Sequence, residues 1–137
     1  MIVLDTNVVS ETMRLRPDGA VTAWLDQQDW SDLHLTAVVI AELRFGGARL
    51  PAGQRQSALL ERIGSLVRQF ESRILPFDVE ATEWFAAIAA QRARIGSPID
   101  FADAQIAAIC RLHGATLATR NERDFAACGI SVVNPWG

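Results

Sequence analysis

Four acidic side chains carry the chemistry that this sequence offers: Asp5, Glu42, Asp103 and Asp124. Asp5 ends a short apolar stretch that is predicted to be a strand buried on both faces. Because ligands of open α/β sheets bind beyond the carboxyl ends of the strands, Asp5 is expected at the edge of a crevice. Glu42 is the one acid of a mostly apolar helix, so it either faces a polar group or lies on the solvent side.

Asp103 stands three residues after Asp100, where a helix is predicted to begin. Asp100 is placed as an N-cap, and the helix dipole favours an acid in the first turn, so helix initiation alone explains both acids. Apolar residues follow Asp103 directly, however, and they place it at the mouth of a buried helix. This favours a role for Asp103 in the site.

Carboxylates that lie close together repel one another, and each raises the pKa of its neighbours unless a cation offsets the charge. Oxygen ligands without histidine or thiol select Mg²⁺, or Mn²⁺, over zinc and copper. Such an ion activates water for attack on a phosphodiester and offsets charge on the phosphate oxygens. The sequence therefore predicts phosphodiester hydrolysis, with Arg120 and Arg123 holding the flanking backbone.

Other reactive arrangements are missing from the sequence. Cys110 and Cys128 form no C-x-x-C pair and are expected to be small core residues. His34 and His113 lack the spacing of metal ligands, and His113 is expected near the C-terminal dipole of a helix. No P-loop, dinucleotide-binding glycine turn or nucleophile elbow is present, so the corresponding enzyme classes are poor candidates.

The composition is that of one globular domain. The chain has 137 residues, of which 50% are hydrophobic, so we expect a single domain over residues 1–137. A net charge of -3 argues against holding nucleic acid by bulk electrostatics. All 13 basic residues are arginine, which either suits a phosphate-binding surface or reflects a codon preference. No stretch is apolar enough to span a membrane and no signal peptide is evident, which predicts a cytoplasmic protein.

Strands that alternate with helices must position the acids. The predicted strands are 2–4, 33–36, 73–77, 115–119 and 130–133, and the predicted helices are 8–16, 18–28, 37–45, 54–72, 80–95 and 100–113, with a helical turn at 124–127. This alternation is typical of an α/β three-layer sandwich, in which a mainly parallel sheet is flanked by helices on both faces. The first and fourth strands then end on the same rim, where the converging side chains are Asp5, Thr119, Asn121 and Asp124, joined by Glu42 and Asp103.

Local signals define several helix ends. Thr36 is expected to cap the 37–45 helix, Gly46-Gly47 to end it, and Asp78 to cap the 80–95 helix. In the latter helix the residues expected to face inward are Trp84, Phe85, Ile88, Ala89 and Ile95. The amphipathic 54–72 helix carries no chemistry, and its apolar stripe fits either the sheet or a second copy of the chain.

Four motifs together resemble the PIN domain: Leu4-Asp5-Thr6-Asn7, Ala41-Glu42-Leu43, residues 103–108 and residues 119–125. More narrowly, the sequence resembles the ribonuclease toxins of VapBC-type toxin–antitoxin modules. Residues 5–11 and the closing Asn134-Pro135-Trp136 are similar to the FitB branch. The resemblance implies a PIN-like parallel sheet flanked by helices, an RNA substrate, a cognate antitoxin that blocks the site, and a homodimer.

The resemblance also implies roles for individual residues. Asp5, Glu42 and Asp103 match the family's acids, with Asp5 and Asp103 as the direct Mg²⁺ ligands. Asn121 stands where many relatives have an aspartate, so the fourth acidic position falls on either Asn121 or Asp124. Side chains implied to support the ligands through hydrogen bonds are Thr6, Asn7, Thr119 and Asn121.

Three functions remain open from the sequence. The leading hypothesis is a Mg²⁺-dependent endoribonuclease that acts as a toxin. The alternatives are a catalytically weak interaction protein that works through antitoxin binding, and a metal-dependent DNase, because no sequence feature reads the 2′-hydroxyl of RNA. Incubation with RNA and with DNA, in Mg²⁺ or in chelator, separates the three.

Overall fold

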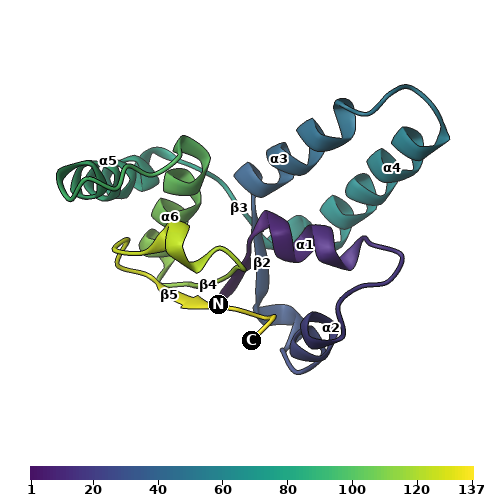
Figure 1. The fold of residues 1–137 in the computed structure, drawn as a ribbon, viewed down its shortest axis with the longest axis horizontal. Helices are drawn as coiled ribbons and strands as arrows, with labels where there is room; N and C mark the ends of the chain where they lie inside the picture. The colour runs from purple at the N-terminus through teal and green to yellow at the C-terminus, as the bar shows by residue number, and fades with distance from the viewer.

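A sheet of five parallel strands forms the centre of the fold (Figure 1). The computed structural model describes residues 1–137. The strands are β1 (Ile2–Leu4), β2 (Leu33–Thr36), β3 (Ile74–Leu75), β4 (Thr116–Ala118) and β5 (Ser131–Val133), in the order β3-β2-β1-β4-β5. Every neighbouring pair is parallel, which confirms the predicted α/β class.

The strand order changes direction at β1, which lies between β2 and β4. Val3 of β1 pairs with His34 on one side and with Leu117 on the other. Connections on the two sides of such a point run to opposite edges of the sheet, so a crevice opens beyond the carboxyl ends of the central strands. Asp5 and Thr119 are the residues that follow β1 and β4 at this crevice.

Six helices and three 3₁₀ turns surround the sheet. They are α1 (Thr6–Thr12), α2 (Gly19–Asp26), η1 (Trp30–Asp32), α3 (Ala37–Ala48), α4 (Gln54–Gln69), η2 (Glu71–Arg73), α5 (Val79–Arg94), α6 (Phe101–His113) and η3 (Glu122–Phe125). Figure 1 shows that α3 and α4 form one helical pair and α5 and α6 another, on opposite sides of the view. None of the helices has the length and apolar content that crossing a bilayer requires.

Two predicted helix caps are confirmed. The Thr36 hydroxyl accepts a hydrogen bond from the Val39 N–H at 3.1 Å and begins α3. The Asp78 carboxylate accepts one from the Ala81 N–H at 3.0 Å and begins α5. Each bond satisfies a main-chain donor that has no partner inside its helix. The two helices therefore begin within a residue of their predicted positions.

The prediction that Gly46-Gly47 ends α3 is wrong, because the helix continues to Ala48. A Cβ atom on residue 47 would lie 2.7 Å from Leu60 Cδ2 of the neighbouring α4. The missing side chain at Gly47 thus lets α3 and α4 approach closely, and Ile63 of α4 is buried beside them. The apolar stripe of α4 was expected to pack on the sheet or on a second copy of the chain, whereas in the structure α4 packs against the neighbouring helix α3.

Several predicted bounds are wrong by one to four residues: α1 ends at Thr12 rather than 16, α2 is Gly19–Asp26 rather than 18–28, α4 ends at Gln69 rather than 72, and the last helical turn is 122–125 rather than 124–127. Three other differences have a direct explanation. Helix α1 begins at Thr6 rather than residue 8, because Asp5 itself is its N-cap. Strand β3 is only two residues long, since Pro76 has no N–H to donate to a neighbouring strand. Ile95 was expected to face inward but is 53% exposed, because α5 ends at Arg94 before it.

The core lies where the sheet meets α6. Val3 and Leu117 of the central strands are fully buried, and six residues of α6 are buried against them. Cys110 and Cys128 are both buried and unpaired, which confirms them as core residues. Burial raises the pKa of the Cys110 thiol to about 12, so it stays protonated and unreactive.

Candidate active site

Asp5 lies at the carboxyl end of β1 and is only 4% exposed. Its Oδ1 accepts a hydrogen bond from the Thr6 N–H at 2.8 Å, and its Oδ2 accepts bonds from Thr119 Oγ1 at 2.7 Å and Asn7 Nδ2 at 3.2 Å. Its main-chain N–H donates to the Ala118 carbonyl at 2.9 Å. Backbone and side chain are both held, so the carboxylate has one orientation.

Thr119 and Asn7 connect the ends of β1 and β4. The buried Thr119 hydroxyl accepts hydrogen bonds from Asn7 Nδ2 at 3.2 Å and from the Asn121 N–H at 3.1 Å, while it donates to Asp5. Asn7 Oδ1 accepts from the Arg120 N–H at 3.1 Å. The sequence predicts Asp5 and Thr119 on one rim, and the structure brings both together with Asn7 into one network.

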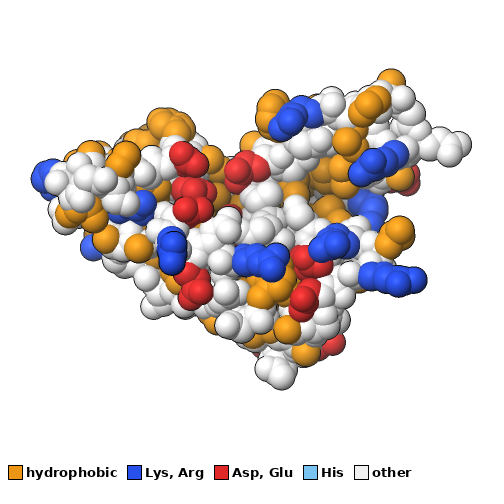
Figure 2. Space-filling model, viewed as in Figure 1, with side chains coloured by type: hydrophobic (Ala, Val, Ile, Leu, Met, Phe, Trp, Pro, Cys, Tyr) orange, Lys and Arg blue, Asp and Glu red, His pale blue; other side chains and the backbone are white.

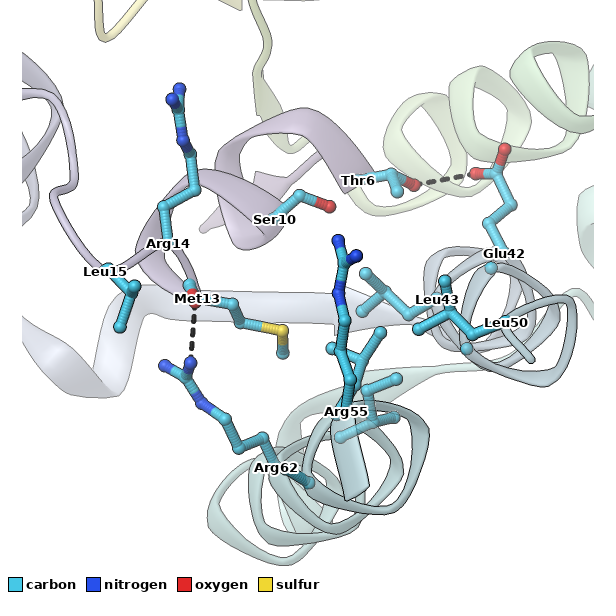
Figure 3. Close-up of a pocket in the computed structure, with 15 residues that line it drawn as sticks. Thr6, Ser10, Met13, Arg14, Leu15, Glu42, Leu43, Leu50, Arg55 and Arg62 are labelled. Carbon is cyan, nitrogen blue, oxygen red and sulfur yellow. Dashed lines mark hydrogen bonds between the residues drawn. The ribbon is translucent and has the colours of Figure 1, made fainter. Parts of the chain in front are cut away.

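Glu42 reaches the same rim from α3. Its Oε1 accepts a hydrogen bond from Thr6 Oγ1 at 2.8 Å, as the dashed line in Figure 3 shows. The side chain is half-buried, and the expectation that it faces a polar group is confirmed. Thr6 therefore connects the helix that follows β1 to the acid of α3.

Asp103 lies in the first turn of α6 and has no hydrogen-bond or ion-pair partner. Burial and the charges of nearby carboxylates raise its pKa to about 7; those carboxylates are Asp5, Asp124, Asp100 and Glu42. Burial also raises the pKa of Asp5, and repulsion from Asp124 adds to this against the hydrogen bonds that it accepts. Acids from separate elements thus act on one another electrostatically at the crevice.

Asp124 and Asn121, the two candidates for the fourth acidic position, differ in their surroundings. Asp124 lies on η3 and is exposed, yet its charge acts on both Asp5 and Asp103. Asn121 contributes its main-chain N–H to Thr119, and its side chain is exposed. Arg120 and Arg123 are exposed beside them, and the Arg120 guanidinium stacks on the Trp136 ring at 4.9 Å from its centroid.

Figure 2 shows acidic side chains gathered beside the notch between the two helical pairs, over α6 and the start of α3. The chain has only two ion pairs, Met1 with Asp32 and Arg14 with Glu11, so no basic side chain neutralises the acids at the crevice. The donors available to a cation there are carboxylate and hydroxyl oxygens, with no histidine or thiol. This chemistry fits a hard divalent cation.

The geometry limits how such a cation is held. No group of three or more acidic, histidine or cysteine side chains is arranged to hold a metal ion together. Mg²⁺ typically takes one or two carboxylates directly and keeps several waters. The residues therefore fit an ion bound by one or two aspartates, and they do not fit a cage built wholly from protein side chains.

A groove of about 880 Å³ adjoins Glu42 and Thr6, between α1, α3 and α4. Its floor is apolar, and Arg14, Arg55 and Arg62 line it. Figure 3 shows Arg55 extending from α4 into the groove. It also shows the hydrogen bond of 2.6 Å that Arg62 donates to the main-chain carbonyl of Met13, the C-cap of α1. The sequence assigned no chemistry to α4; its available signal was the seven-residue spacing of Arg55 and Arg62, which puts both on one helix face.

Known proteins provide close matches to the whole chain. The PIN domain family model matches residues 2–129. The chain is 44% identical to the VapC ribonuclease Y4jK of Sinorhizobium fredii, over 99% of this chain and 98% of that protein. It is 42% identical to the toxin FitB of Neisseria gonorrhoeae, over 99% of both chains.

Solved structures show the same fold. The structure of FitAB bound to a DNA fragment contains a chain that superposes with a TM-score of 0.94 at 41% identity, over 100% of this chain and 96% of that chain. A chain of the DNA-bound VapBC complex of Salmonella typhimurium superposes with a TM-score of 0.81 at 25% identity, over 98% of this chain and 97% of that chain.

Proposed function

The chain belongs to the PIN-domain family, and from this premise we propose that it is a metal-dependent endoribonuclease that acts as the toxin of a toxin–antitoxin module. The activity is carried by a single domain of residues 1–137. One observation carries the proposal: carboxylates from the end of β1 and from α3, α6 and η3 act on one another at one crevice with no basic partner. The 44% identity to a VapC ribonuclease favours RNA as the substrate.

We propose Asp5 and Asp103 as the residues that hold Mg²⁺, or Mn²⁺ in its place. When bound, the ion lowers the pKa of water and offsets charge on the phosphate. Asp5 is already oriented for this by Thr6, Asn7 and Thr119. Asp103 accepts no competing hydrogen bond, so both of its oxygens are available.

Glu42 is suited to accept a proton from the attacking water. Its Oε1 is held by the Thr6 hydroxyl, which leaves Oε2 without a protein donor. Asp124, exposed at the rim, adds the fourth negative charge that attracts the cation. Arg120 and Arg123 stand beside these acids and are proposed to hold phosphates of the RNA on either side of the cut.

The partner is proposed to be a cognate antitoxin protein. FitB and VapC relatives were solved as the complexes FitAB and VapBC. The groove beside Glu42 supports such a partner here, because an apolar segment bound in it would reach the Thr6–Glu42 pair and cover Glu42. Acidic residues on that segment would meet Arg14, Arg55 and Arg62.

Two lesser proposals accompany this function. Exposed apolar side chains, among them Val79 at 84% and Phe101 at 69%, support a homodimer, which sedimentation would measure. A cytoplasmic location agrees with a substrate and partner of this kind.

A nuclease assay tests the function. Purified protein is incubated with RNA and with DNA, each in Mg²⁺ or in chelator. We expect RNA cleavage that chelator abolishes and that Asp5→Asn removes. The matched control is Asp78→Asn, because Asp78 is also an N-cap, its charge is not among those that act on Asp5 and Asp103, and asparagine caps helices about as well.

Other results would favour the alternatives. Cleavage of DNA alone would indicate a metal-dependent DNase. Cleavage of neither substrate by a folded protein would indicate an interaction protein that works through antitoxin binding. A folded Asp5→Asn variant that still cleaves RNA would remove Asp5 from the proposed ligands, and circular dichroism establishes that the variant is folded.

A further inference from the structure

Arg92 is a buried cation without an acidic partner. It lies near the end of α5 and is 4% exposed. A guanidinium stays charged at any accessible pH, and burying it is costly unless its N–H groups are hydrogen-bonded. The hydrogen-bond acceptors of Arg92 therefore indicate its role in the structure.

The guanidinium binds two separate segments of main chain. On one side, Nε donates to the Ser97 carbonyl at 2.7 Å and Nη2 to the Ser97 hydroxyl at 3.3 Å. On the other, Nη1 donates to the carbonyls of Asp124 at 2.9 Å and Ala126 at 3.0 Å, with Cys128 Sγ at 3.6 Å. The planar group thus joins the α5–α6 connection to η3 and the residues after it.

One of these segments leads directly to a crevice acid and the other contains one. Ser97 lies in the connection that leads into α6, whose first turn holds Asp103. Asp124 lies on η3, and the carbonyl that Arg92 binds is its own. Among the side chains of this chain, Arg92 is the one whose hydrogen bonds reach both segments.

The segment after η3 contains a residue in an unfavourable backbone conformation. Ala127 has a φ of +57°, in the left-handed region that costs a residue with a Cβ about 1 kcal/mol or more. The bonds from Arg92 to the carbonyls of Asp124 and Ala126 bracket the residues that precede this turn. Without these two hydrogen bonds, the backbone around Ala127 would be free to adopt a less strained conformation. We expect Asp124, which lies in the same segment, to shift with it.

We propose that Arg92 is a positioning residue that sets the separation of the Asp103 and Asp124 side chains, an inference that rests on the proposed function of these acids. Arg92 binds main-chain oxygens rather than the carboxylates and forms no ion pair with them. It therefore holds the acids in place without neutralising the charge that attracts a cation.

Arg111 provides a matched control. Its Nη1 donates to the Cys128 carbonyl at 3.0 Å, and its guanidinium stacks on the Trp84 ring at 4.8 Å. It thus supports the same segment as Arg92 but reaches neither Asp124 nor Ser97. If Arg92 had only a structural role, replacing it would have the same effect on metal binding as replacing Arg111.

The test compares Mn²⁺ binding by calorimetry in wild type, Arg92→Met, Arg92→Lys, Arg111→Met and Arg111→Lys, all kept below their melting temperatures. Outer residues that hold metal ligands typically contribute about 10- to 100-fold to metal affinity. We expect Arg92→Met to weaken Mn²⁺ binding by that factor, Arg92→Lys to recover part of it, and the Arg111 variants to match wild type. RNA cleavage by Arg92→Lys should lose kcat with KM unchanged.

Equal losses in the Arg92 and Arg111 variants, or wild-type affinity in Arg92→Met, would overturn the proposal. If Arg92→Met does not fold, the Mn²⁺ affinities of Arg92→Lys and Arg111→Lys are compared instead, and equal affinities would overturn the proposal. Crystal structures of wild type, Arg92→Lys and Arg111→Lys measure the separation of the two acids directly. That measurement holds whether or not the protein cleaves RNA, so a failure of the proposed function appears in the nuclease assay alone.

Discussion

Replacing Asp103 by asparagine should make the metal-free protein more stable while it removes activity. The carboxylate of Asp103 accepts no hydrogen bond, and the charges of the other acids act on it. Asparagine has nearly the same shape but no charge, so Asp103→Asn relieves the repulsion without opening a cavity. A metal ligand that costs stability when no metal is bound is the expected signature of a site selected for function.

The size of the effect follows from the pKa of Asp103. A rise from 3.8 to about 7 corresponds to roughly 4 kcal/mol as an upper bound. The side chain is only half-buried, so solvent and salt screen it, and the favourable helix dipole at the start of α6 offsets a further part. We therefore expect about 1 to 2 kcal/mol, or roughly 3 to 8 °C in the melting temperature of a chain of this size.

The sign of the pH dependence is fixed by the same shift. Well below pH 4 the carboxyl is protonated in both the folded and the unfolded chain, so wild type and variant should approach equal stability. As the pH rises from 4 to 7, the unfolded chain ionises while the folded chain keeps its proton, and wild type loses stability relative to the variant. Above pH 7 the difference should be constant.

Thermal unfolding followed by circular dichroism, in chelator at pH 4 and at pH 8, measures this difference. Glu80→Gln is the control, because Glu80 occupies the first turn of α5 as Asp103 occupies that of α6, but lies among no other crevice acids. Adding Mg²⁺ should raise the melting temperature of wild type and not that of Asp103→Asn. A variant that melts at or below the wild-type temperature at pH 8 in chelator would refute the repulsion argument.

Four further predictions follow from the site. Thr119→Val should lower the free energy of unfolding by about 2 kcal/mol and abolish RNA cleavage, because it leaves the buried Asp5 carboxylate without its shortest hydrogen bond; denaturant titration and the nuclease assay measure both. Asp100→Asn should keep near-wild-type cleavage, since the Asp100 side chain makes no capping hydrogen bond. Mg²⁺ at about 100 times its dissociation constant should stabilise the protein by about 2.7 kcal/mol, measured by thermal unfolding with a magnesium series. Arg120→Ala should raise KM for RNA with little change in kcat, and steady-state cleavage at several salt concentrations measures this.

The parallel sheet was predictable because its strands are short apolar runs that end in polar residues. β2 was predicted with its observed bounds, and the order of helices and strands along the chain was correct. The glycines of α3 show where such reasoning ends. Glycine is a helix-ending signal in the sequence, but Gly47 instead serves contact with Leu60 of α4, and only the packed structure shows that contact.

Part of the site was also predictable, since parallel strands bring their carboxyl ends to one rim. This reasoning placed Asp5 beside Thr119, and a hydrogen bond of 2.7 Å joins them. It gave no reason to select Arg92, because an arginine among alanines in a helix reads as a solvated residue. Its burial depends on main-chain carbonyls of η3, which carry no signal in the sequence.

The central place of β1 has a consequence for synthesis on the ribosome. Asp5 is made before the rest of the site, and the hydroxyl that orients it comes from Thr119, 114 positions later. At about 5 to 20 residues per second, this interval lasts roughly 6 to 23 seconds of translation. A nascent chain therefore carries an unassembled centre for as long as the residues between Asp5 and Thr119 are being made, because Asp5 lacks the hydroxyl that orients it until then.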